Sequence, residues 1–325
     1  MNAILKFEPI FKSVIWGGQR IARFKGIAPQ GDHVGESWEL SPMEGNESVV
    51  AEGPFKGIGL NSLIADHGDE IMGARLMKAC GGRFPLVIKF IDSTDDLSVQ
   101  VHPDDDLAAR RHNGSLGKTE MWYSILPAEG AYLYAGFSRR LDADSFRSAV
   151  ADNSIIDSLR RHDTRQGDVF FLPAGRIHSI GRGNFVLEIQ EASDITYRIY
   201  DYDRRDAQGN PRQLHIEESV GAIDFNDIAD DCETPRILPV AGRTQCLQSC
   251  PYFTTEVTGI ASKTTLDLSG RDSFTIAIAT EGHLTLTPAG GETVELPQGC
   301  TALIPASVQE VEIDGNGSLV TVHVQ

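Results

Sequence analysis

Residues 166–205 read QGDVFFLPAGRIHSIGRGNFVLEIQEASDITYRIYDYDRR, and this stretch decides the fold. Its first apolar run ends at Pro173 and Gly175, which are the residue types that a tight turn requires. His178 follows directly, and a second apolar run encloses Glu188. Two strands joined by a turn with a histidine at its end are typical of a β-barrel mouth, where a metal ligand or a catalytic base is presented. The stretch therefore predicts a barrel that carries a site.

Two further groups of polar residues lie upstream of this stretch. Ser98, Gln100 and His102 alternate with apolar residues, which is typical of a strand that places all three on one face. Polar side chains are costly to bury in a hydrophobic core, so this strand face is expected to border either solvent or a functional site. Lys118 and Glu120 are two residues apart and are also expected to share a strand face.

The order and spacing of these segments resemble a known family. The spacing Gly167-x5-Pro173-x-Gly175-x2-His178 is similar to the second motif of the cupin superfamily, with the usual Asn displaced to Asn184. In the first motif, Gln100 replaces the first histidine of His-x-His, and an insertion precedes Glu120. Three segments in this order resemble type I phosphomannose isomerases: QVHPDD at 100–105, GKTEMWY at 117–123 and LPAGRIHSIG at 172–181. The resemblance covers residues 16 to about 215, and TYRIYDYDRRDAQGNPRQLH at 196–215 resembles the short bacterial branch.

The resemblance implies a metal site formed by His102, Glu120 and His178. Gln100 matches a fourth ligand of longer, fungal-type members, and water is the alternative occupant of that position. Imidazole, carboxylate and amide ligands suit one Zn²⁺ in the catalytic domain, with Mn²⁺, Fe²⁺ or Co²⁺ as substitutes. An isolated histidine is more often a core or surface residue. That interpretation is kept for His33, His67, His112, His162, His215, His283 and His323.

The reaction implied by the resemblance interconverts mannose 6-phosphate and fructose 6-phosphate through a cis-enediol. It requires an electrophile and an acid/base group at one face of the sugar. Arg198 follows Glu188 by ten residues, as the essential arginine does in the family, and is expected to stabilise enediolate charge or hold the phosphate. The alternative for an isolated arginine here is a surface ion pair with Asp194 or Asp201.

Lys118 and Glu188 are both expected to lie in the catalytic pocket, and the sequence does not decide which of them carries the proton. A lysine beside a bound cation releases its proton more readily, which suits base chemistry near neutral pH. Ser98 and Lys89 are predicted to help bind the phosphate, although Lys89 in its apolar segment 85–92 could instead extend to a sheet edge. The family also places the segments at 15–18 and 36–41 near the substrate.

The length of 325 residues favours two domains. Residues 1–240 are predicted to form a metal-binding cupin domain with helical insertions. Residues 241–325 contain several short apolar runs separated by Gly and Pro, which is typical of strands. Gly299-x5-Pro305 repeats Gly167-x5-Pro173, but Ser307 and Glu310 stand where Gly175 and His178 would be. We therefore expect a mainly β protein of two cupin-type jelly-roll barrels, the second degenerate, structural and without metal ligands.

A few helices are expected on or inside the N-terminal part. The segment 61–80 has helical spacing of its apolar residues, and its role stays unassigned. Short helices are predicted over 107–112, 141–159 and 215–220, and residues 224–239 are expected to connect the domains.

The charge and the cysteines exclude some classes of function. A formal charge of −17 argues against nucleic-acid binding, and no apolar run is long enough for a membrane helix. The five irregularly spaced cysteines favour a reduced cytoplasmic protein. The expected partner is a small sugar phosphate, and the oligomeric state stays open. Two alternatives remain at this level: a metal-dependent cupin dioxygenase and a non-catalytic sugar-binding cupin.

Overall fold

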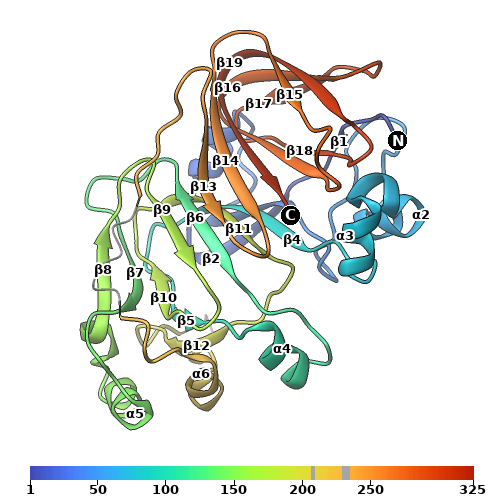
Figure 1. Ribbon diagram of the computed structural model, residues 1–325. Helices are drawn as coiled ribbons and strands as arrows, with labels where there is room; N and C mark the ends of the chain where they lie inside the picture. The colour runs from blue at the N-terminus through green and yellow to red at the C-terminus, as the bar shows by residue number, and fades with distance from the viewer. Residues whose placement is uncertain (206–208, 229–234) are drawn as a thin grey trace.

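The computed structural model describes residues 1–205, 209–228 and 235–325, and most of this chain forms antiparallel strands (Figure 1). Part of the connection expected at 224–239 falls outside the described residues, as does Cys232. The described strands form three sheets, of six, five and eight strands. Two of these sheets build the N-terminal part, and the third builds the C-terminal part.

The two N-terminal sheets face each other. The six-stranded sheet has the order β2 (Ile10–Gly18), β3 (Val34–Leu40), β4 (Leu86–Asp92), β11 (Phe185–Glu191), β6 (Glu120–Ser124) and β9 (Val169–Leu172). The five-stranded sheet has the order β12 (Tyr197–Tyr200), β5 (Val99–Val101), β10 (His178–Ile180), β7 (Tyr132–Phe137) and β8 (Leu159–Asp163). Apolar side chains from both sheets form one cluster between them, which includes Trp16, Ile91, Trp122, Leu133, Phe170, Ile180 and Val186.

The six-stranded sheet is covered on both faces, so its central strand β11 is buried along its whole length. Phe185, Leu187 and Ile189 pack on the outer face against helices and the C-terminal sheet. The alternate residues point between the two N-terminal sheets, because successive side chains of a strand point to opposite faces. Glu188 and Gln190 are therefore polar side chains enclosed by protein, which marks the inner face as the place of a site.

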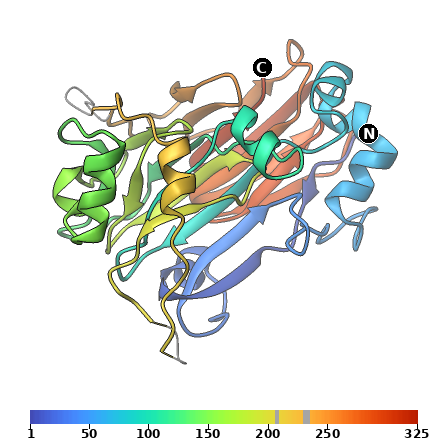
Figure 2. The ribbon, with the colours of Figure 1, turned by 90° about the horizontal axis from the view of Figure 1, so that it is seen from below.

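The helices lie at the periphery of the sheets (Figure 2). The predicted helix over 61–80 is in fact two helices, because Gly73 interrupts it with a φ of +85° and a side chain there would meet Asp272. The other expected helices are found, and no described helix combines the length and apolar character needed to cross a bilayer. The helical elements are α1 (Arg20–Lys25), α2 (Leu60–Met72), α3 (Ala74–Ala79), α4 (Asp105–Arg111), α5 (Ala143–Ala151), the 3-10 helix η1 (Ile155–Ser158) and α6 (Ile216–Ala222).

The C-terminal sheet contains a strand from the other end of the chain. The sheet consists of β1 (Leu5–Lys6), β18 (Thr301–Ile304), β16 (Thr275–Pro288), β19 (Glu310–His323), β14 (Thr254–Ile260) and β13 (Thr244–Ser249), with β15 (Thr264–Asp267) on β19 and β17 (Val294–Pro297) on β16. Two of the short apolar runs of this part, at 275–279 and 284–287, lie in one strand, β16. Gly282, with a φ of +76°, continues it past a register shift at Ala279.

The internal repeat predicted from glycine and proline spacing has a structural counterpart. Gly167 and Gly299 both adopt positive φ, +86° and +78°, and each precedes a four-residue strand that ends before a proline. Glu310, at the position corresponding to His178, is exposed. The predicted mainly β fold with cupin-type sheets and few helices is confirmed, whereas the division at residues 240 and 241 stays a prediction.

Candidate active site between the two N-terminal sheets

The candidate site lies where the inner faces of the two sheets meet. Lys89 and Glu188 are register partners on β4 and β11 of the six-stranded sheet. Gln100 on β5 is the register partner of His178 on β10 and of Arg198 on β12 in the five-stranded sheet. Residues from five strands that are distant in the sequence are thus brought to one place by sheet pairing.

Three of the predicted residues form a buried cluster of metal-ligating type. Glu120 Oε2 lies 3.5 Å from His102 Nε2, and Glu120 Oε1 lies 3.3 Å from His178 Nε2. One ligand atom from each residue lies within 4.8 Å of the other two, and all three side chains are buried. The structure therefore brings together the three residues that the sequence predicted as metal ligands.

The hydrogen bonds of the two histidines orient their rings for ligation. His102 Nδ1 lies 2.8 Å from the carbonyl oxygen of Ile195, and His178 Nδ1 lies 2.8 Å from that of Arg176. A carbonyl only accepts, so each Nδ1 carries the proton and each Nε2 presents a lone pair toward Glu120. This is the arrangement in which protein histidines hold metal ions.

Burial sets the protonation of this cluster. It lowers the pKa of His178 to about 3, and burial together with Lys118 holds the pKa of His102 well below its usual range. Both rings are therefore neutral near pH 7. Burial also raises the pKa of Glu120 to about 7, against the opposing effect of Lys118. A buried carboxylate beside two neutral imidazoles is favoured by a cation among them.

These residues fit a divalent metal ion. Glu120 Oε1 is fully buried and accepts no hydrogen bond from the described residues. The two Nε2 atoms and this oxygen form a mixed nitrogen and oxygen set without thiolates, which suits zinc and related borderline ions. Gln100 lies beside the set, with its Nε2 placed 3.3 Å from His178 Nε2. Rotation of the amide would turn its oxygen toward the same point.

Lys118 is buried against the cluster. Its Nζ lies 2.6 Å from Glu120 Oε2 and 3.1 Å from His102 Nε2. Lys118 also lines the adjacent cavity, so the same side chain reaches both the cluster and the space for a substrate.

Lys89 and Glu188 form an interior ion pair. Lys89 is only 8% exposed, and its Nζ lies 2.9 Å from Glu188 Oε1 while also donating to Gln190. Trp122 Nε1 donates to Glu188 Oε2 at 2.8 Å. Burial would raise the pKa of Glu188, but Lys89 and Lys118 outweigh it and lower this pKa to about 2. Lys89 thus points inward rather than to a sheet edge.

A cavity of about 240 Å³ lies directly beside these groups. Arg198 lines it, and its Nε is buried without a hydrogen-bond partner among the described residues, while Nη1 donates to the carbonyl of Gln213 at 3.1 Å. The alternative of a surface ion pair with Asp201 is not found, because Asp201 pairs with Arg204 and Arg212 instead. The predicted residues that line this cavity are Lys89, Ser98, Gln100, Lys118, Glu188 and Arg198.

Sequence reasoning missed part of the cavity wall. Arg212, Asp194 and Thr196 were not expected to line it, and no spacing signal marks them because they lie in irregular segments. Trp16, Glu36 and Trp38 also line it, as the resemblance suggested for their segments. Trp38 lies under the Lys89 ammonium, 4.6 Å from its ring centroid.

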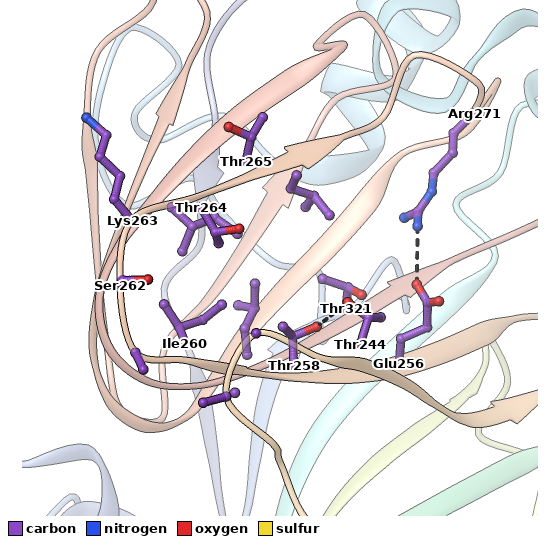
Figure 3. A pocket seen from close by; sticks show the side chains of 17 residues that line it. Thr244, Glu256, Thr258, Ile260, Ser262, Lys263, Thr264, Thr265, Arg271 and Thr321 are labelled. Carbon is purple, nitrogen blue, oxygen red and sulfur yellow. Dashed lines mark hydrogen bonds and ion pairs between the residues drawn. The ribbon is translucent and has the colours of Figure 1, made fainter.

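The C-terminal sheet has a different cavity, of about 420 Å³ (Figure 3). Threonine side chains point into it, including Thr244 and Thr258, whose hydroxyls are 2.9 Å apart, and Arg271 pairs with Glu256 at 3.2 Å. No second cluster of metal-ligating type is found in the described part of the chain.

Comparisons with known proteins point to one family. The family model for "phosphomannose isomerase type I, catalytic domain" matches residues 4–123, and "mannose-6-phosphate isomerase, cupin domain" matches residues 243–324. The chain is 34% identical to mannose-6-phosphate isomerase of Streptococcus mutans, over 97% of this chain and 98% of that one. It is 32% identical to mannose-6-phosphate isomerase ManA of Bacillus subtilis, over 98% of each.

Solved structures show the same fold. The crystal structure of mannose 6-phosphate isomerase from Bacillus subtilis matches with a TM-score of 0.86 and 30% identity, over 99% of this chain and 100% of that one. A phosphomannose isomerase from Salmonella typhimurium shares the fold with a TM-score of 0.78 at 17% identity, over 99% of this chain and 100% of that one. The chain therefore belongs to the type I mannose-6-phosphate isomerase family.

Proposed function

We propose that this protein interconverts mannose 6-phosphate and fructose 6-phosphate, using Zn²⁺ held by His102, Glu120 and His178. The observation that carries the proposal is the junction of a buried ligand cluster with a cavity lined by cationic side chains. Gln100 and Lys118 belong to both the wall of the cavity and the surroundings of the cluster. The family favours this isomerase over the oxygenase and the non-catalytic alternatives.

The reaction moves protons without net oxidation or reduction of the sugar. The hydrogen at C2 leaves as a proton and a proton is added at C1, while the hydroxyl proton on O2 passes to O1 through the cis-enediol. Bound zinc would act as a Lewis acid that polarises the carbonyl and the adjacent hydroxyl group. The protein must then supply a proton carrier and bind the phosphate.

The contacts favour Lys118 as the proton carrier. Both oxygens of Glu188 are engaged, by Lys89 and by Trp122, and its pKa of about 2 makes it a weak base. Lys118 lies beside the ligand cluster and faces the cavity. We assign to Glu188 the task of holding the Lys89 ammonium at the cavity wall.

Arg198 is our candidate for binding the phosphate of the substrate or for stabilising the negative charge of the enediolate. Its partly buried guanidinium retains an unpaired Nε among the described residues, and a buried unpaired donor is costly unless a ligand uses it. Lys89 and Ser98 line the same cavity and support phosphate binding.

The test uses protein stripped by a chelator and then supplied with Zn²⁺. We expect conversion of mannose 6-phosphate to vanish and return with the metal, and Arg198→Ala to lower kcat/KM by about 100-fold or more while zinc content is unchanged. Arg161→Ala is the matched control, because Arg161 pairs with Asp163 outside the cavity. Zinc-loaded wild-type protein that never converts this substrate would refute the proposal.

We also propose that the protein is located in the cytoplasm. Cys80, Cys246, Cys250 and Cys300 are all free thiols, which is the state expected in a reducing compartment.

A further inference from the structure

Two carboxyl groups hold the backbone on either side of Lys118. The amide of Gly117 donates to Asp105 Oδ1 at 2.7 Å, and the amide of Thr119 donates to Glu191 Oε2 at 2.6 Å. The amide of Glu191 in turn donates to the carbonyl of Thr119 at 3.1 Å. Hydrogen bonds to Asp105 and Glu191 thus hold the backbone of segment 117–119 in place. This segment leads directly into Glu120 at the start of β6.

The same segment makes a close backbone contact with the start of α4. A Cβ atom at Gly117 would lie 2.6 Å from the carbonyl carbon of Asp104 and from the amide nitrogen of Asp105, so no larger residue fits there. The amide of Lys118 donates to the carbonyl of Pro103 at 3.1 Å. Three successive amides therefore have fixed partners, and two of those partners are carboxyl groups.

The two carboxyl groups lie close enough to interact with each other. Asp105 and Glu191 line the same cavity, and Asp105 acts on the protonation of Glu191. Burial, reinforced by Asp105, raises the pKa of Glu191 to about 8, so Glu191 is the protonated member near pH 7. Tyr252, from the C-terminal part of the chain, lines the same cavity, where burial and the neighbouring Glu191 and Asp105 raise the pKa of its hydroxyl.

This unit lies outside the catalytic cavity. Asp105, Glu191 and Tyr252 line a separate cavity of about 470 Å³, which shares no lining residue with the catalytic one. The three side chains therefore have no access to substrate or to the ligand cluster. They can act on the reaction only through the backbone that they hold.

We propose that Asp105, Glu191 and Tyr252 form a positioning unit that places Lys118 and Glu120 for catalysis. In this unit Glu191 acts as a neutral acid, and Tyr252 connects the C-terminal sheet to the active site. This role gives the degenerate C-terminal part a contribution to catalysis. The inference rests on the proposed function as far as turnover is concerned, whereas the backbone placement can be measured separately.

The test compares two substitutions of Glu191. Glu191→Gln keeps one acceptor for Thr119 and one donor for Asp105, as a protonated carboxyl does, whereas Glu191→Leu removes both. We expect Glu191→Leu to lower kcat roughly 10- to 100-fold with KM changed less than about threefold, and Glu191→Gln to stay within about threefold of wild type. Equal loss in both variants would refute the neutral-acid role.

Tyr252→Phe tests the connection to the C-terminal part. It also provides a test of the positioning unit if Glu191→Leu does not fold. It removes one hydroxyl, and we expect kcat to fall about two- to fivefold. Tyr132→Phe is the matched control, because its hydroxyl lies beside an aspartate, donating to Asp96 at 2.8 Å, but does not contact segment 117–119. Wild-type kcat in Tyr252→Phe, or the same loss in Tyr132→Phe, would overturn the connection.

Amide hydrogen exchange provides the readout that does not depend on turnover. Peptides that contain residues 117–119 should exchange at least about tenfold faster in Glu191→Leu than in wild type. In Tyr252→Phe the increase should be smaller, and in Glu191→Gln and Tyr132→Phe the exchange rate should match that of wild type. Unchanged exchange in Glu191→Leu would refute the positioning unit. If wild-type protein fails to convert mannose 6-phosphate while exchange responds as expected, the proposed function fails and the positioning unit stands.

Discussion

His102 and His178 approach one point from different strands, and each is oriented by a backbone carbonyl rather than by another side chain. Backbone carbonyls move little when a nearby side chain is replaced, so the remaining ligands should keep their orientation in a single variant. The contribution of one histidine to metal binding can therefore be measured in isolation.

Replacement of His178 by Ala should weaken zinc binding by about 100-fold or more, because one of three buried ligands is lost. His162→Ala is the control, since His162 is partly buried but lies outside the ligand cluster. Competition with a chromophoric chelator measures the affinity. Equal affinity in wild type and His178→Ala would contradict the assigned ligand set.

The protonation of Glu191 predicts a pH dependence of stability. Its pKa of about 8 in the folded protein lies above its ordinary value of 4.5. Its contribution to the free energy of unfolding is therefore fully present below about pH 4.5 and is lost as pH rises through about 8. Charged or titratable groups that surround it are Asp105, Tyr252 and Cys250, with Arg75, Lys78 and Arg83 lining the same cavity.

Glu191→Gln should make this free energy less dependent on pH, because the amide stays neutral. Between about pH 5 and 8 we expect the urea midpoint of wild type to fall more than that of the variant. The exposed Glu129→Gln is the control. Parallel pH profiles for wild type and Glu191→Gln would contradict the neutral state of Glu191.

Among the elements, α4 shows how one short motif serves two purposes. His102 lies just before the helix and belongs to the ligand cluster, whereas Asp104 caps the helix by accepting from the amide of Leu107 at 2.7 Å. The next residue, Asp105, holds Gly117. The helix thus orders the turn between the ligand strand and the Lys118 segment.

Asp104→Ala should lower the free energy of unfolding by about 1 kcal/mol, because the helix loses its capping acceptor. Asp104→Ser keeps an acceptor and should stay within a few tenths of a kcal/mol of wild type. Urea unfolding measures both, and equal losses in the two variants would show that the cap is not the cause. The activity of Asp104→Ala reveals whether helix order is transmitted to Lys118.

At the scale of the whole molecule, the N- and C-terminal parts share apolar contacts. β1 pairs with β18, and one apolar cluster contains residues from both parts. Phe84 and Phe274 are buried in it with ring centroids 4.6 Å apart. Contacts of this kind couple the folding of the two parts.

We therefore expect one cooperative thermal transition for the full chain. Phe274→Ala should cost about 3–5 kcal/mol and lower the midpoint of that single transition. Phe274→Leu is the milder comparison and should cost less. Calorimetry measures the transition, and two separate transitions in wild-type protein would contradict this coupling.

Much of the site was predictable because its residues carry local signals. The strand periodicity marked Ser98, Gln100 and His102, and the Gly and Pro spacing marked the turn before His178. Both signals are local in the sequence, since side-chain alternation and positive φ are properties of a few neighbouring residues. The resemblance to a family supplied the roles of these residues.

Tertiary structure alone decided the remaining features. The break between α2 and α3, the pairing of β1 with β18 and the cavity wall at Arg212 all depend on contacts between distant segments. The positioning contact between Glu191 and Thr119 spans 72 residues. No local pattern encodes such a pair, because its energy arises from burial and from a partner that only the folded chain brings near.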